Sequence, residues 1–103
     1  MIHQLRIYEI FENNKTAFHA RFHDHAMRIM KRYGFHIVSM WESSYGGRTE
    51  FVHLLSWPDL ATREDAWRRF LADPEWVKIK RVTNAKYGDL VGEIEDRVLE
   101  PLR

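Results

Sequence analysis

The segment FHIVSMWESSYGGRTEFVHLLSW, residues 35–57, decides the fold of this chain. Its two halves, 35–45 and 49–57, are rich in the β-branched and aromatic residues that favour extended strands. The Gly46-Gly47 pair between them is typical of a tight turn, because glycine adopts the backbone conformations that such turns require. The segment is therefore predicted to be an antiparallel β-hairpin.

A strand and a helix are predicted before the hairpin. Residues 2–11, IHQLRIYEIF, favour a strand, and Asn13 or Asn14 after it is a suitable helix cap. Between residues 15 and 33 the apolar residues recur at the spacing of one helical face: Phe18, Phe22, Ala26, Ile29 and Tyr33. Gly34 follows, in the position where helices often end in a left-handed residue.

Two helical segments and a last strand are predicted after the hairpin. Pro58 ends the second strand, and Asp59 can cap a helix over residues 60–72. The sequence Asp73-Pro74-Glu75 is typical of a new helix start, with a cap, a proline in the first position and an acid in the first turn. Residues 90–99 favour a strand, although Gly92 weakens its beginning.

The resulting order of elements is strand, helix, strand, strand, helix, strand. This is the split βαβ order of the α+β ferredoxin-like fold, in which a four-stranded antiparallel sheet has its helices on one face. A chain of 103 residues has the usual length of one domain, so residues 1–103 are expected to form a single domain.

Both faces of the predicted sheet carry apolar residues. In the first half of the hairpin Phe35, Ile37 and Trp41 alternate to one side, and Val38 and Met40 point to the other. Helices on one face would leave the other apolar face open to water, and aromatic residues already make up 14% of this short chain. We therefore expect a homodimer that packs through its sheet faces.

Composition excludes several function classes. The chain has no Cys, which excludes disulfides, thiolate metal sites and a cysteine nucleophile. The formal net charge is +1 and the basic residues are balanced by acids, so no nucleic-acid partner is expected. No run approaches the roughly 18 apolar residues of a membrane span, and the first strand is too polar for a signal peptide. We expect no membrane partner and a cytoplasmic location.

Short motifs in a fixed order carry a family resemblance. They are Arg6 with Tyr8, Tyr33-Gly34, Trp41-Glu42, Phe51-Val52-His53-Leu54, Trp57, Asp59-Leu60, Arg63, Trp67 and, as the most specific, Asp73-Pro74-Glu75-Trp76. By these motifs nearly the whole chain resembles the NIPSNAP family, within the dimeric α+β-barrel superfamily of ferredoxin-like folds. The resemblance implies a dimeric α/β barrel in which two sheets face each other and the helices lie outside.

The resemblance implies no agreed activity. Relatives in the superfamily include cofactor-free monooxygenases acting on aromatic polyketides, isomerases and heme-dependent enzymes. Their pockets generally lie between sheet and helices, but one fold hosts many functions.

Arg63 is the most informative polar residue, because it shares the apolar stripe of its helix with Trp67 and Phe70. A charge in that position must be paired or face a cavity. It either binds an anion or carbonyl in a pocket walled by tryptophans, or it forms a structural ion pair or covers apolar surface with its stem. Trp41, Trp67 and Trp76 are the candidate ligand-binding walls, with core or dimer packing as the alternative.

Three further residues are candidates for chemistry. His25 is predicted to face the helix–sheet gap as a general base, Tyr8 is the second catalytic candidate, and His53 is a candidate ligand contact. Each has a structural alternative, a buried side chain satisfied by a hydrogen bond. His19 and His23 share a helical face, but a zinc site needs a third ligand on the same side, so no metal site is expected.

Three functions remain open from the sequence. The favoured one is a cofactor-independent enzyme acting on a small carbonyl-bearing or aromatic molecule, with Arg63 holding an oxyanion and His25 or Tyr8 moving a proton. The second is a non-catalytic dimeric module that binds a small ligand or a protein. The third is a heme or metal site, which would need a histidine facing a large cavity; we expect no cofactor.

Overall fold

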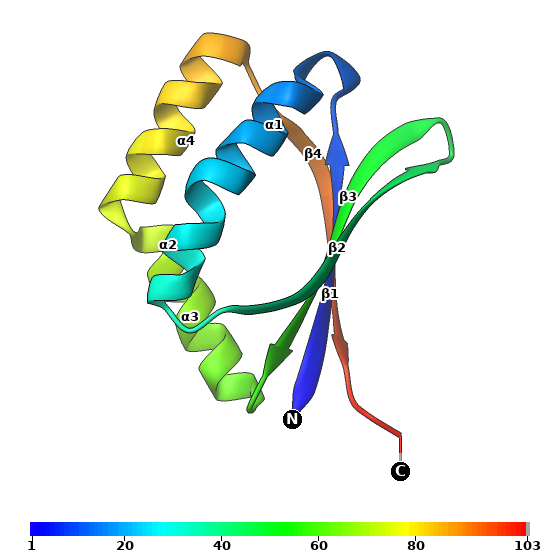
Figure 1. The fold of residues 1–103 in the computed structure, drawn as a ribbon, viewed down its shortest axis with the longest axis vertical. Helices are drawn as coiled ribbons and strands as arrows, with labels where there is room; N and C mark the ends of the chain where they lie inside the picture. The colour runs from blue at the N-terminus through cyan, green and yellow to red at the C-terminus, as the bar shows by residue number, and fades with distance from the viewer. Residues whose placement is uncertain (103) are drawn as a thin grey trace.

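The computed structural model describes residues 1–102 and confirms the predicted α+β ferredoxin-like order. One antiparallel sheet runs in the order β2-β3-β1-β4 and consists of β1 (Ile2–Ile10), β2 (His36–Tyr45), β3 (Arg48–Trp57) and β4 (Val91–Leu99). All the helices lie on one side of this sheet, and its other side is bare (Figure 1). No helix among residues 1–102 is long and apolar enough to cross a bilayer.

The predicted hairpin forms, with one irregularity. Gly46 and Gly47 have φ angles of 61° and 78°, the left-handed pair that a tight two-residue hairpin turn requires. The pairing of β2 with β3 shifts between Ile37 and Ser39, so Ile37 lies opposite Leu55 whereas Trp41 lies opposite Val52. The prediction that Ile37 and Trp41 share a face is therefore wrong, because one extra residue in a strand reverses every side chain beyond it.

The helix predicted over residues 15–33 consists of three consecutive segments. After the 3₁₀ turn η1 (Glu12–Asn14) come α1 (Lys15–Arg21), the π-helical η2 (Phe22–Ala26) and α2 (Met27–Arg32). A four-residue step overshoots one α-helical turn by about 40°, so a stripe spaced by fours drifts off its face. The wider π turn offsets this drift, and Phe18, Phe22, Ala26 and Met30 all stay buried.

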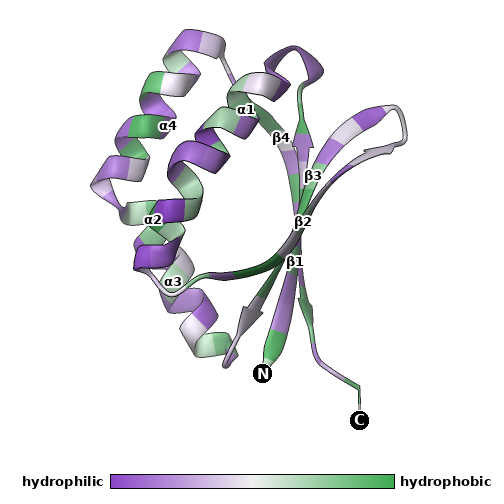
Figure 2. Ribbon diagram, in the orientation of Figure 1, coloured by the Kyte–Doolittle hydropathy of each residue, from purple (hydrophilic) through white to green (hydrophobic). Residues whose placement is uncertain are grey.

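Two helices follow the hairpin, α3 (Leu60–Ala72) and α4 (Pro74–Tyr87). Both predicted caps are confirmed: the Asp59 carboxylate accepts from the Thr62 backbone N–H at 2.7 Å, and that of Asp73 from Trp76 at 3.0 Å. Hydrophilic and hydrophobic residues alternate in bands along these helices (Figure 2). Asn14 does not cap α1; its amide instead donates to the backbone of the loop before β4.

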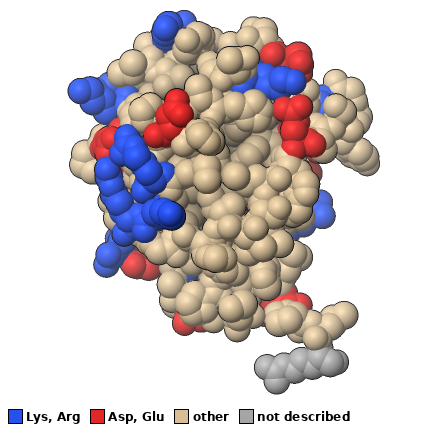
Figure 3. All heavy atoms as spheres, in the orientation of Figure 1, with Lys and Arg blue, Asp and Glu red and all other residues tan. Residues whose placement is uncertain are grey.

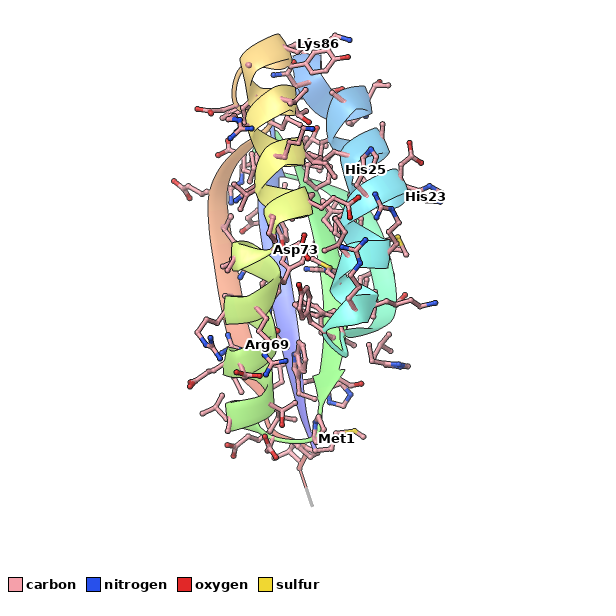
Figure 4. The ribbon with its side chains drawn as sticks, turned by 90° about the vertical axis from the view of Figure 1, so that its left-hand side faces the viewer. Met1, His23, His25, Arg69, Asp73 and Lys86 are labelled. Carbon is pink, nitrogen blue, oxygen red and sulfur yellow. The ribbon has the colours of Figure 1, made fainter. Side chains whose placement is uncertain are left out.

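The motif that begins at Asp73 also joins α4 to α2. The Tyr33 hydroxyl donates to Asp73 at 2.6 Å, and Arg28 and Arg32 of α2 both pair with Glu75. Figure 4 shows Asp73 at the junction of α3 and α4. These contacts give the Asp-Pro-Glu-Trp motif a structural role, because they fix the helical layer above the sheet.

The two faces of the sheet differ in what covers them. The inner face, which the helices cover, includes Gln4, Tyr8, Phe51, His53, Leu55 and Trp57, all buried. The outer face includes Leu5, Ile7, Val52 and Leu54, which are half-buried, and Trp41, which is 50% exposed. Charged side chains gather toward the edges of the molecule in Figure 3.

Candidate functional site

A cavity of about 240 Å³ lies between the helices and the sheet. Aromatic rings from several elements form its walls: Tyr8, Phe18, Phe22, Trp67, Phe70 and Trp76. Its polar lining consists of Arg6, Arg21, Lys80, Asn84 and Asp89. Pockets for drug-sized ligands occupy about 300–1,000 Å³, so this cavity suits a smaller molecule.

A buried glutamine organises one end of the inner face. The Gln4 side-chain oxygen accepts hydrogen bonds from the indole N–H groups of Trp57 and Trp67, both at 2.9 Å, and its amide donates to Asp96 at 2.8 Å. The Gln4 side chain thus has three hydrogen-bond partners, and its bond to the indole holds the Trp67 ring in the cavity wall.

Asp96 of β4 joins two arginines from different elements. Its carboxylate accepts from Arg6 of β1 at 2.7 Å and from Arg63 of α3 at 2.9 Å. Arg63 thus forms the structural ion pair that was one of its two predicted roles, and it does not line the cavity. Any effect of Arg63 on a ligand would pass through Asp96 and Arg6.

Arg6 and Tyr8 form the polar part of the cavity wall on β1. The Arg6 Nε donates to the Tyr8 hydroxyl oxygen at 2.7 Å, and the guanidinium lies 4.2 Å from the centre of the Trp67 ring. Burial raises the pKa of Tyr8, an effect that the charge of Arg6 opposes. The phenol is therefore neutral, and its own proton remains available for a ligand oxygen.

Arg21 and Lys80 are cavity residues that the sequence analysis missed. Arg21 of α1 is only 9% exposed, and its guanidinium donates to the Asn84 side chain at 3.2 Å. Arg21 follows Phe18 by three positions and Lys80 follows Trp76 by four, so both border an apolar stripe. That spacing was the signal that could have identified them.

Trp67 and Trp76 both lie in the cavity wall, which is the position predicted for them. Trp76 stacks on Phe70 with ring centres 5.0 Å apart, and its buried indole N–H has no hydrogen-bond partner among residues 1–102. Binding of a ligand by either tryptophan stays a prediction.

His53 is enclosed by rings rather than open to the cavity. It is fully buried against Tyr8, Phe22 and Phe51, and neither ring nitrogen has a partner within the described chain. Burial, reinforced by the charge of Arg6, lowers the pKa of His53 to about 3, so the ring is neutral. His53 is therefore an uncharged neighbour of Tyr8.

The structure corrects the predicted positions of His25 and Trp41. His25 lies outside the cavity, on the outer side of the helical layer (Figure 4), with its Nδ1 3.1 Å from Arg28. Its predicted place in the gap assumed a regular α-helix, and the π-helical η2 begins three residues before it. Trp41 lies on the outer face because of the irregularity in β2, so it cannot line this cavity.

No histidine lines the cavity, and His19 instead pairs with Glu42 at 3.0 Å. Within residues 1–102 no group of three or more histidine and acidic side chains comes together in a way that could hold a metal ion.

The fold and this cavity define the class of protein: a ferredoxin-like α+β domain with an aromatic-walled site between sheet and helices. The family model named NIPSNAP matches residues 3–103. The chain therefore belongs to the NIPSNAP family. No match was found among curated protein sequences.

Solved structures agree with this assignment. A NIPSNAP family protein with unknown function from Agrobacterium tumefaciens is 25% identical, with a TM-score of 0.82 over all of this chain and 89% of that one. An uncharacterized NIPSNAP domain protein from Burkholderia xenovorans is 20% identical, with a TM-score of 0.81 over 99% of this chain and 95% of that one. A proposed antibiotic biosynthesis monooxygenase from Nitrosomonas europaea is 12% identical, with a TM-score of 0.66 over all of both chains, and shares the fold.

Proposed function

We propose that this chain is a cofactor-independent enzyme acting on a small carbonyl-bearing or aromatic molecule bound in the cavity. The observation that carries the proposal is the Arg6–Tyr8 pair in an aromatic wall. The Tyr8 oxygen already accepts from Arg6, so its hydroxyl proton can be donated to an oxygen of the ligand.

This pair suits chemistry in which negative charge develops on a ligand oxygen. When a carbon next to a carbonyl loses a proton, the charge moves to the carbonyl oxygen, where the Tyr8 hydroxyl and the Arg6 charge would stabilise it. The cavity lining has no histidine to serve as a base near neutral pH. Asp89 is the one carboxylate of the lining, so the suitable substrates are carbonyl compounds or phenols acidic enough to lose a proton to a carboxylate or to water.

A homodimer through the outer face is the second part of the proposal. Four strands about 4.8 Å apart and nine or ten residues long cover roughly 600 Å² in plan, close to the about 800 Å² that each partner buries in a standard interface. Leu5, Ile7, Val52, Leu54 and Trp41 would form its apolar centre. Each subunit would keep its own cavity on the side away from the partner.

Hydrogen–deuterium exchange tests the enzymatic proposal without any cofactor. In D₂O the protein should accelerate exchange of the methylene hydrogens of benzoylacetone, followed by NMR, and Tyr8→Phe should lower the protein-dependent rate about 100-fold. Tyr45→Phe is the matched control, because Tyr45 is 75% exposed on the hairpin. Equal rates for the wild type and Tyr8→Phe would rule out this role for the hydroxyl.

The alternative is a non-catalytic module that binds the same class of molecule. The observation that favours it is the position of the predicted base, since His25 lies outside the cavity and His53 is enclosed. Quenching of tryptophan fluorescence by benzoylacetone without any acceleration of exchange would establish binding alone.

A further inference from the structure

The far end of the cavity from the Gln4 network holds two cations with no acidic partner. Arg21 is buried and Lys80 is half-buried, and neither lies within 4.0 Å of a carboxylate in residues 1–102. Asp89 also lines the cavity, but it forms no ion pair with either of them. Within the described residues, the one polar side-chain contact of Arg21 is the Asn84 oxygen at 3.2 Å.

Both cations lie over the same ring. The Arg21 guanidinium is 5.5 Å and the Lys80 ammonium 5.9 Å from the centre of the Trp76 indole. Burial lowers the pKa of both groups, and the charge of Arg21 lowers that of Lys80 further. The chain thus holds two like charges close together in a partly dry site.

Such an arrangement costs free energy unless water or an anion solvates the two charges. A buried charge without a counter-charge is costly, and a cation–π contact offsets only part of that cost. The hydrogen-bond donors that remain unused are the other N–H groups of Arg21, the Lys80 ammonium and the Asn84 amide. All of them come from side chains that line the cavity, and all would suit an anionic oxygen group.

We propose that Arg21, Lys80 and Asn84 form a carboxylate-binding subsite, so that the ligand of this cavity is an aromatic or carbonyl-bearing carboxylate. This inference rests on the proposed function, because it needs a ligand in the cavity. It adds the chemical class of that ligand: one end meets the Arg6–Tyr8 pair and the other carries a carboxylate held between α1 and α4.

A pair of probes that differ only in charge tests the subsite. The dissociation constants of 4-acetylbenzoate and of its neutral analogue 4-acetylbenzamide are measured by calorimetry at pH 7. Wild-type protein should bind the carboxylate at least about 10-fold more tightly, as expected for a charge-assisted contact. Arg21→Met and, separately, Lys80→Met should remove this preference and leave the affinity for the amide unchanged.

Arg81→Met is the matched control, because Arg81 is an exposed residue of α4 that does not line the cavity. It should keep the preference for the carboxylate. Since Arg21 is buried, thermal unfolding of each variant is checked first, and Lys80→Met carries the test if Arg21→Met does not fold. Equal binding of both probes by the wild type would overturn the subsite and leave the proposed cavity function standing. Binding of neither probe would overturn both.

Discussion

The inner face of the sheet, which the helices cover, carries Gln4, Arg6 and His53 among its aromatic residues, whereas the outer face, which nothing in residues 1–102 covers, carries Leu54 and Ile7. In an antiparallel sheet with one covered face, polar residues usually lie on the open face and apolar residues on the covered one. The difference shows that the two faces meet different requirements.

The inner polar residues are stable because most of them satisfy one another. Gln4 accepts hydrogen bonds from two tryptophans and donates to Asp96, which accepts from two arginines, and Arg6 and Trp67 of this network line the cavity. The outer residues Ile7 and Leu54 have no polar side-chain groups and gain only by leaving water. The comparison therefore supports the proposed ligand site on the inner face and the proposed dimer interface on the outer face.

The largest expected effect comes from placing a charge on the outer face. Leu54→Lys would force two ammonium groups into the apolar centre of the proposed dimer, where unpaired charges are very costly. Light scattering should show the wild type at twice the 12.4 kDa of one chain and the variant at that single mass. Val82→Lys, at an exposed position of α4, should stay dimeric. A monomeric wild type would contradict the proposed interface.

The next effect breaks the inner network. Asp96→Ala leaves Arg6, Arg63 and the Gln4 amide without their shared acceptor. The variant should lower the free energy of unfolding by about 2–3 kcal/mol, which is less than the loss from breaking a fully buried pair, because Asp96 is partly exposed. Urea unfolding at fixed protein concentration measures the change. Asp65 pairs with exposed Arg69 on α3, away from the proposed interface, so Asp65→Ala should cost under about 0.5 kcal/mol. Equal losses would show that the inner network contributes no more than a surface ion pair.

A pH-dependent effect distinguishes a buried histidine from a ligand contact. Because the folded pKa of His53 is lowered to about 3, the unfolded chain takes up the proton first, and stability falls as the pH drops from 6.5 towards 3. The slope from this group is at most about 1.4 kcal/mol per pH unit. His53→Leu removes this pH dependence. The free energy of unfolding of the variant minus that of the wild type should therefore be about 2 kcal/mol larger at pH 5 than at pH 7. Parallel stability curves for the two proteins would contradict this account.

The smallest effect is expected for the surface ion pairs that join Glu75 of α4 to Arg28 and Arg32 of α2. Arg28 and then Arg32 lower the pKa of Glu75 to about 2, so the contribution of this carboxylate is complete above pH 4.5 and is lost as the pH falls through 2. The free energy of unfolding of the wild type, followed by circular dichroism, should therefore fall more steeply below pH 4.5 than the titration of His53 alone predicts. Glu75→Gln should reduce the slope of the free energy of unfolding against pH only below pH 4.5. Above that pH the variant should differ from the wild type by a constant amount, and a difference in slope there would mean that these ion pairs and the inner face are coupled.

Much of the fold follows from short stretches of sequence. The hairpin turn at Gly46-Gly47 and the helix caps Asp59 and Asp73 form as predicted, because a turn or a cap involves only residues a few positions apart. The face of Trp41 does not follow, since a single extra residue in β2 reverses it and nothing in the alternation of residues marks that position.

The site depended more on long-range packing. Trp67, Trp76 and Tyr8 line the cavity because each lies on an apolar helix stripe or on the covered strand face, and their roles toward a ligand stay predictions. His25 does not, because a π-helical turn changes the rotation of its helix. Arg21 and Lys80 both lie over the Trp76 ring only because α1 packs beside α4, and the sequence of either helix does not indicate which helix packs against it.

By itself the sequence determined the order of the elements, the caps, the family resemblance and the presence of apolar residues on both faces of the sheet. These depend on local hydrogen bonds and on periodicities of a few residues, which any single segment already contains. The tertiary structure alone decided that Asp96 joins Arg6 to Arg63 and that Arg21 lies beside Lys80 without a counter-charge. Those contacts depend on strand register and on the rotation and packing of helices distant in sequence. Many weak interactions together determine that register and packing.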